Sequence, residues 1–197
     1  EFGATDYLDY IAEHPVPVSY GKYPYAKSWN EGFSMDLDAP KGIYRSNCLA
    51  RLNVADHITT ELAQVELEQF RSSFGRPAQH TFLYHWARLI ELLYACEKTK
   101  ELLSDKKITD PETRIDATPS AGRGVGHVEA PRGTLIHDYT TDENGCIKSA
   151  NMIVGTTHNL APISMSVEQS AKMLIRDGNV NEEILNKVEM AVSAYDP

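Results

Sequence analysis

The sequence contains no run of about 18 apolar residues, so it predicts no membrane-spanning helix. It also lacks a basic segment followed by an apolar core, so we expect no secretory signal peptide. Basic residues are scarce as well: 19 Lys and Arg stand against 28 Asp and Glu, a formal net charge of −9. Because phosphate contacts need a basic surface, this balance argues against nucleic acid as a partner.

Cysteine is equally scarce, with three residues in the 197-residue chain: Cys48, Cys96 and Cys146. They are odd in number, lie far apart and form no C-x-x-C pair, so they predict neither a disulfide framework nor a metal-binding knuckle. His80 and His85 would lie roughly 140° apart around a helix, which makes them a poor pair of ligands. We therefore expect a reducing, cytoplasmic setting and no metal ion bound by this chain alone.

The order of the patterns suggests one structural domain built from four segments. Residues 1–58 read as an irregular segment rich in aromatic residues and proline, and residues 59–105 as a pair of helices. Residues 106–160 read as a Gly/Pro-rich loop and a β-hairpin, and residues 161–197 as short C-terminal helices. The chain starts without Met at Glu1-Phe2 and stops at Asp196-Pro197, so we expect a fragment of a longer protein.

The two helices within residues 59–105 are predicted from the spacing of their apolar residues. The first helix can be capped by Thr59 or Thr60, and Gly75 and Pro77 interrupt the chain after it. Its apolar stripe would be Leu62, Val65, Phe70 and Phe74. The stripe of the second helix would be Phe82, Leu83, Trp86, Leu89, Ile90, Leu93 and Tyr94. Two such helices in succession predict an antiparallel pair.

Strand-like runs follow at 127–136 and 146–154, separated by Asp142-Glu143-Asn144-Gly145, whose Asn-Gly step is typical of a hairpin turn. Ser166 with Gln169 reads as a capping box, Gly178 as a helix stop, and Asn181 as the cap of a last helix. The predicted fold class is therefore α+β, mainly helical, with an antiparallel helical bundle and a small antiparallel sheet near residues 127–154.

The stretch 122–134 is the first candidate site because it places Arg132 between Pro131 and Gly133. Proline fixes φ and glycine permits close backbone approach, so Arg132 would be a permanent cation on a stiff mount. From spacing alone, a surface hairpin whose arginine pairs with a carboxylate is the favoured alternative. The second candidate, residues 154–159, brings together Thr156, Thr157 and His158. Its alternative is a strand end where threonines satisfy backbone groups.

Four stretches occur in a fixed order: Tyr20–Tyr25 with Leu49–Val54; Leu83–Glu91; Gly124–Tyr139 with its Glu-Ala-Pro-Arg-Gly core; and Thr156-Thr157-x-Asn159. Together they resemble the large, nickel-carrying subunit of [NiFe] hydrogenases, and the details resemble its cytoplasmic, F420-non-reducing (methyl-viologen-reducing) branch. That family continues beyond Asp196-Pro197 into Asp-Pro-Cys-x-x-Cys-x-x-His. One departure is Ser46-Asn47-Cys48, where many relatives have Gly-Pro before Leu-Ala-Arg.

The resemblance implies a Ni–Fe(CN)₂(CO) centre held by four cysteines, all outside this chain. Arg132 matches the arginine over the open metal position, and Asp196 matches the carboxylate near it. Ala130 and Pro131 match residues that line the diatomic ligands, and Thr156 matches a hydroxyl that hydrogen-bonds a cyanide.

The implied activity is reversible, heterolytic cleavage of H₂ by the whole enzyme, with the isolated fragment inactive. The implied partners are an electron-acceptor module, heterodisulfide reductase-like or nicotinamide-linked, and an iron–sulfur small subunit. Two alternatives stay open: a metal-free relative of the quinone-site subunit of complex I, and a stand-alone interaction module. Retention of the Pro-Arg-Gly core and of Asp196-Pro197 favours the hydrogenase.

Overall fold

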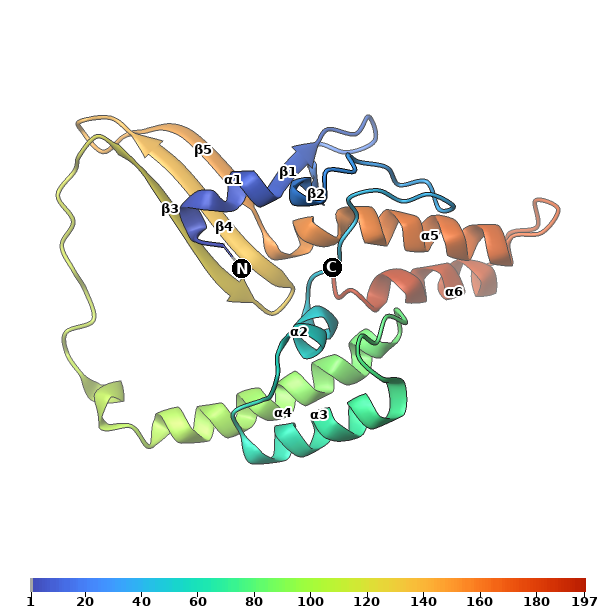
Figure 1. The fold of residues 1–197 in the computed structure, drawn as a ribbon, viewed down its shortest axis with the longest axis horizontal. Coiled ribbons are helices and arrows are strands. Elements are labelled where there is room, and N and C mark those ends of the chain that lie inside the picture. The colour runs from blue at the N-terminus through green and yellow to red at the C-terminus, as the bar shows by residue number, and fades with distance from the viewer. Residues whose placement is uncertain (1) are drawn as a thin grey trace.

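A computed structural model describes residues 2–197. Figure 1 shows a three-stranded sheet at the upper left, one helical pair along the bottom and a second helical pair at the right, with the short helix α2 (Cys48–Val54) near the centre. The fold is α+β and mainly helical, as predicted, with one two-stranded and one three-stranded antiparallel sheet in the described chain. No helix within residues 2–197 is long and apolar enough to cross a membrane.

The predicted antiparallel helical pair is confirmed as α3 (Glu61–Phe74) and α4 (Leu83–Leu103). Glu97 of α4 accepts hydrogen bonds from the first backbone amides of α3, those of Leu62 (3.1 Å) and Ala63 (3.0 Å). This contact satisfies N–H groups that a helix start leaves without an intrahelical partner.

The stripe predicted for α3 is partly wrong, because the buried positions are Ala63, Leu67 and Phe70. Leu62 and Val65 are each 57% exposed. Ala63, Leu67 and Phe70 are spaced at i, i+4 and i+7 and so form one helix face, and Leu62 and Val65 lie outside that face. On α4, Ile90 is buried as predicted, whereas Phe82 and Leu89 are exposed.

The N-terminal segment is less irregular than predicted. It contains α1 (Tyr7–Tyr10), a small sheet of β1 (Ile11–His14) and β2 (Tyr23–Ala26), and α2. The helix α2 has only seven residues, too few for a clear 3.6-residue period. Three short 3₁₀ helices, η1 (Ala4–Asp6), η2 (Lys27–Trp29) and η3 (Lys106–Thr109), complete the connections up to residue 109.

The predicted sheet is present but has three strands: β3 (Gly122–Ala130), β4 (Gly133–Thr141) and β5 (Ile147–Ile153). The run predicted as one strand over 127–136 is therefore two strands that reverse at Pro131-Arg132. Residues 122–126, predicted as loop, pair with β4 instead. Backbone ladder bonds need no side chain, so alternating glycines can join a sheet without an apolar pattern. Tyr7 packs on one face of the sheet against Ile136 and Ile153.

The C-terminal helices are α5 (Leu160–Leu174) and α6 (Glu182–Ser193). The capping box predicted at Ser166 is wrong: α5 begins six residues earlier, because Pro162 in its first turn is compatible with a helix start. Gly178 lies in the turn after α5 rather than at its end. Asn181 does cap α6, since its side chain accepts the Ile184 amide at 2.9 Å.

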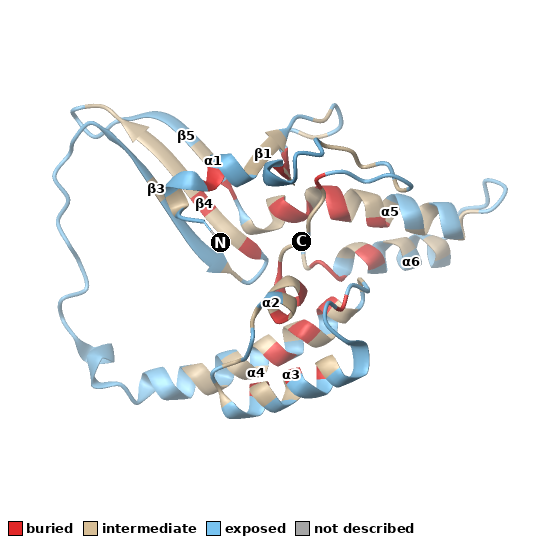
Figure 2. Cartoon of the chain, viewed as in Figure 1, coloured by how far each residue is buried: buried red, intermediate tan, exposed pale blue. Residues whose placement is uncertain are grey.

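The main core forms where α2, α3 and α4 meet the last residues of the chain, and it includes Leu52, Phe70, Tyr84 and Tyr195. Figure 2 shows the buried positions gathered around α2 and the C-terminus, while the far ends of α4, α5 and α6 are exposed. The 3₁₀ helix η4 (Gly155–Asn159) joins the end of β5 to α5 beside this core.

Candidate functional site

The candidate site is built on the tight reversal between β3 and β4. Gly133 has φ of +140°, and a Cβ there would lie 2.5 Å from Ser46 Oγ and 2.8 Å from the Gly155 carbonyl oxygen. Only glycine fits such a conformation and such an approach. A Cβ on Gly155 would in turn meet the Arg132 carbonyl carbon and the Gly133 backbone at 3.2 Å. The reversal and η4 are thus pressed together through backbone contacts.

Arg51 of α2 also holds the reversal between β3 and β4, through hydrogen bonds to its backbone carbonyls. Its guanidinium donates to the Ala130 carbonyl (2.9 Å) and to the Pro131 carbonyl (2.7 Å). It also forms a two-bond pair with Glu91 (2.6 and 2.5 Å) and a bond with Glu129 (2.6 Å). Burial acts to lower the pKa of Arg51, but the two carboxylates outweigh burial and the pKa lies above its usual value. The planar fork of arginine suits this simultaneous set of bonds.

Arg132 itself points to the end of the chain. Its Nε donates to the Asp196 carbonyl (2.5 Å), and its Nη2 lies 3.1 Å from Asp196 Oδ2. Arg88 Nε lies 4.0 Å from the same carboxylate oxygen, and Arg88 also donates to the Ala194 carbonyl (2.9 Å). The side chains of Arg132 and Asp196 are 47% and 42% exposed, so the pair stands at the surface of the described chain.

The backbone of Arg132 is fixed as well as its side chain. Its carbonyl accepts bonds from Ser46 Oγ (3.3 Å) and from Asn159 Nδ2 (3.4 Å). The amide of Asn159 also accepts the Ser46 backbone N–H at 3.0 Å, and Asn159 is 1% exposed. Ser46, Arg51 and Asn159 therefore hold one turn from three directions.

Thr156 follows Gly155 directly and so lies beside the same turn, with a half-buried side chain. Nearby, buried His158 bonds Tyr44 Oη through Nδ1 (2.5 Å) and the Thr134 carbonyl through Nε2 (2.7 Å). Burial lowers the pKa of His158, although the bond to Thr134 opposes that shift. Through these two bonds His158 ties η4 to β4 and to Tyr44.

The five residues singled out from the sequence thus come together from three segments: Ala130, Pro131, Arg132, Thr156 and Asp196. The favoured alternative for Arg132, pairing with a carboxylate, also describes its contact with Asp196. The sequence placed Asn159 in the second candidate stretch and Arg51 in the family stretch Leu49–Val54, but it predicted no contact of Arg51, Ser46 or Asn159 with the turn at Arg132. Their contacts with that turn span 27 to 86 residues of sequence.

The cysteines lie elsewhere. Cys48 is buried with its thiol donating to the Tyr84 carbonyl at 3.3 Å, and burial, with the nearby Glu91 charge, raises the pKa of Cys48 to about 11. Cys96 and Cys146 are exposed. Within residues 2–197 no group of three His, Cys, Asp or Glu side chains could hold a metal ion. The residues described here therefore do not supply the ligand set of a metal centre.

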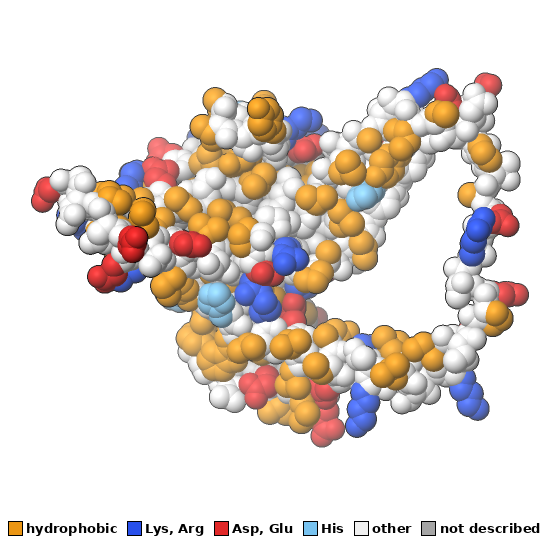
Figure 3. All heavy atoms as spheres, turned by 180° about the vertical axis from the view of Figure 1, so that it is seen from behind, with side chains coloured by type: hydrophobic (Ala, Val, Ile, Leu, Met, Phe, Trp, Pro, Cys, Tyr) orange, Lys and Arg blue, Asp and Glu red, His pale blue; other side chains and the backbone are white. Residues whose placement is uncertain are grey.

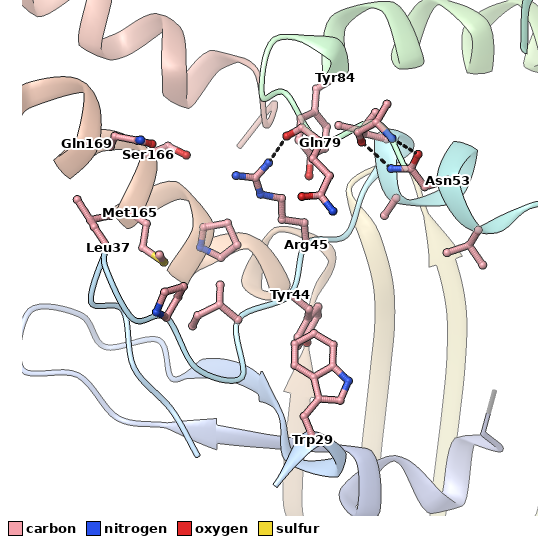
Figure 4. Close-up of a pocket in the computed structure, with 17 residues that line it drawn as sticks. Trp29, Leu37, Tyr44, Arg45, Asn53, Gln79, Tyr84, Met165, Ser166 and Gln169 are labelled. Atoms are coloured by element: carbon pink, nitrogen blue, oxygen red, sulfur yellow. Dashed lines mark hydrogen bonds between the residues drawn. The ribbon is translucent and has the colours of Figure 1, made fainter. Parts of the chain in front are cut away.

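A separate cavity of about 550 Å³ opens between α2, α5 and the segment 29–45 (Figure 4). Its lining mixes aromatic and apolar side chains such as Trp29 and Met165 with polar ones such as Arg45, which donates to the Gln79 carbonyl at 2.8 Å. Arg132 and Asp196 do not line it, so this cavity is distinct from the candidate site.

Comparison with known proteins places these features in a family context. Residues 44–197 match the family model described as nickel-dependent hydrogenase. The chain is 47% identical over 177 residues to one subunit of the F420-non-reducing hydrogenase vhu of Methanococcus voltae, covering 90% of this chain and 40% of that relative. It is 40% identical over 201 residues to the NAD-reducing hydrogenase HoxS subunit beta of Cupriavidus necator, covering 100% of this chain and 40% of that relative.

Among solved structures, the crystal structure of an NAD⁺-reducing [NiFe]-hydrogenase in the H₂-reduced state matches with a TM-score of 0.86 and 38% identity. The match covers 100% of this chain and 42% of that chain, which confirms the predicted large-subunit fold. The chain thus spans about 40% of the length of the relatives that it matches.

Proposed function

Because the chain belongs to the nickel-dependent hydrogenase family, we propose that it forms part of the large subunit of a [NiFe] hydrogenase. In the whole protein, this subunit would cleave H₂ reversibly into protons and electrons. The observation that supports the proposal best is the convergence of Arg132, Asp196 and Thr156 on one rigidly held turn. Retention of the Pro-Arg-Gly core together with Asp196 favours this function over a metal-free scaffold.

The four cysteine ligands would come from parts of the whole protein outside residues 1–197. When bound, the Ni–Fe centre would supply the polarisation and electron transfer that split dihydrogen. We expect the isolated chain to be inactive and to bind no stoichiometric nickel, because none of those soft thiolate ligands is present.

The residues of this chain would shape the surroundings of that centre. Arg132 would place a permanent charge over the reacting position, where a fixed charge in a site closed to water acts far more strongly than in bulk solvent. Asp196 would orient the guanidinium through its carboxylate and its carbonyl. Thr156 would offer its hydroxyl to an anionic iron ligand such as cyanide, and Ala130 and Pro131 would line the diatomic ligands. The residues of this chain would thus hold a charge, orient a neighbouring side chain or line the surroundings of the centre.

We also propose that the immediate partner is an iron–sulfur small subunit. One similar relative is named as an iron–sulfur subunit of an F420-non-reducing hydrogenase, and another as part of an NAD-reducing hydrogenase. The second name supports a nicotinamide-linked electron-acceptor module, and a heterodisulfide reductase-like module is the alternative that the family resemblance implies.

The proposal is tested by Arg132→Lys in the whole protein. Lysine keeps the positive charge but loses the planar fork that serves the carbonyl and the carboxylate of Asp196 together. We expect hydrogen oxidation to fall about a hundredfold, roughly 3 kcal/mol of barrier. Nickel content should stay near normal, because Arg132 is not a ligand.

Arg123→Lys is the matched control, because Arg123 also pairs with a carboxylate, that of Asp138 (2.7 Å), but on the outer part of the sheet. This control should retain nearly full turnover. Wild-type turnover in Arg132→Lys would remove Arg132 from the mechanism, and loss of nickel would make it a structural residue. A wild-type protein that carries nickel but does not oxidise hydrogen would overturn the proposed function.

A further inference from the structure

Asn47, the residue before α2, has an unusual backbone conformation. Its φ is +87° and its ψ is −176°, a region of conformational space that is almost restricted to glycine. The residue is nevertheless an asparagine, and it is only 2% exposed. A strained residue in a buried position persists only where the surrounding structure holds it, and here the contacts of the side chain provide that hold.

The side-chain amide of Asn47 makes two bonds that glycine could not make. Its Oδ1 accepts the Cys48 backbone N–H at 2.6 Å, and its Nδ2 donates to the Tyr195 carbonyl at 2.8 Å. The second bond spans 148 residues and ties the start of α2 to the end of the chain. Figure 1 shows the C-terminus close to α2.

The tie to Tyr195 acts directly on Asp196, the next residue. Asp196 has φ of +53°, and its carboxylate meets the Arg132 guanidinium at 3.1 Å. On the other side of Asn47, Ser46 donates its hydroxyl to the Arg132 carbonyl at 3.3 Å. Adjacent residues therefore hold the two partners of the ion pair, Ser46 on the Arg132 side and Asn47 on the Asp196 side.

We propose that Asn47 is a positioning residue that fixes Asp196 against Arg132 through the Tyr195 carbonyl. Its strained backbone is retained because glycine, which would relieve the strain, has no amide to make the tie. The effect on turnover rests on the proposed function of Arg132 and Asp196. The effect on the position of the chain end does not, and it can be measured separately.

The first experiment measures backbone hydrogen exchange in the whole protein, with Asn47→Gly and Asn47→Asp compared with wild type. Glycine relieves the backbone strain and removes the tie. Aspartate keeps an acceptor for the Cys48 amide but places an oxygen against the Tyr195 carbonyl. Both variants should increase exchange of the Tyr195 and Asp196 amides about tenfold, because their turn loses its anchor. Amides of α3 should be unchanged.

Asn30→Gly is the matched control. Asn30 is a second asparagine at positive φ (58°), but it is exposed and bonds only locally. This substitution therefore relieves strain without touching the chain end, and exchange at residues 195–196 should not change. Unchanged exchange in both Asn47 variants would overturn the proposal, as would an equal increase in Asn30→Gly.

The second experiment is a double-mutant cycle on hydrogen oxidation with Asn47→Gly and Asp196→Asn. Asn47→Gly alone should lower turnover about tenfold with unchanged nickel content. In the Asp196→Asn background it should add little, because its effect passes through Asp196. Additive losses would overturn the positioning role. A wild-type protein without hydrogen oxidation, together with faster exchange in the Asn47 variants, would reject the proposed function and retain the tie.

Discussion

Two regions of this molecule differ in burial and in long-range hydrogen bonding. The first, which we call the junction, consists of residues 44–51, 130–134, 155–159 and 194–196. The second is the outer loop, residues 104–121, which connects α4 to β3. The junction contains buried polar residues, Asn47, His158 and Asn159, whose hydrogen bonds reach other segments of the chain. Every residue of the outer loop is exposed.

The outer loop has few contacts with the rest of the described chain. The Thr141 hydroxyl donates to the Ser120 carbonyl at 2.8 Å, whereas the Arg114–Asp116 ion pair is local and 85% exposed on both sides. In Figure 3 the loop stands away from the body of the molecule and leaves an open space. Ordering such a segment brings little burial to offset its entropy.

The difference shows where this sequence concentrates its specific contacts. At the junction, glycines permit close approach and long-range bonds fix a cation and a carboxylate relative to one another. Within residues 2–197 the outer loop makes few such contacts. Glycine-to-alanine substitutions should therefore have very different effects in the junction and in β3, the strand that follows the outer loop.

Gly133→Ala should have the largest effect. The new Cβ would meet the Gly155 carbonyl oxygen at 2.8 Å and Ser46 Oγ at 2.5 Å, at a φ of +140° that alanine rarely adopts. We expect a loss of about 3 kcal/mol in the free energy of unfolding, from backbone strain and overpacking together. Thermal and urea unfolding of the whole protein would measure it. Stability within about 0.5 kcal/mol of wild type would mean that the junction can relax.

The sequence predicted those structural elements that depend on short-range sequence patterns. The period of α4, the Asn-Gly hairpin turn and the cap at Asn181 are short-range signals, and the structure contains all three. The Pro-Arg-Gly motif located Arg132 for the same reason. The first half of β3, residues 122–126, was missed because Gly122, Gly124 and Gly126 carry no side chains that could alternate in polarity.

The long-range hydrogen bonds that hold the junction together could not be predicted from sequence patterns. Arg51 reaches the Pro131 carbonyl across 80 residues, and Asn47 reaches Tyr195 across 148. No spacing rule connects such positions, because their proximity exists only after the helices and the sheet have packed. The partial match of Leu49–Val54 to the family pattern marked the segment without revealing what its arginine contacts.

Arg51→Lys should have an intermediate effect. Lysine can keep one contact with Glu91 but cannot also bond the Ala130 and Pro131 carbonyls, so the reversal loses one side of its support. We expect a loss of about 2 kcal/mol in unfolding free energy, the range for charge-assisted hydrogen bonds. Turnover in the whole protein should fall with it. Arg114→Lys, whose ion pair with Asp116 is exposed on both sides, is the control. Equal losses in both variants would show that Arg51 is an ordinary surface ion pair.

Gly124→Ala should have the smallest effect, with the opposite sign. Gly124 lies in the edge strand β3 beside the outer loop, with no positive φ, and a Cβ there would meet nothing within 4 Å. Alanine therefore fits the native strand and reduces the freedom of the unfolded chain, which should stabilise the protein by about 0.4–1 kcal/mol. The unfolding measurements used for Gly133→Ala give the comparison directly. A loss above about 1 kcal/mol would show that this strand face is covered in the whole protein, because only a close neighbour could make a methyl group costly there.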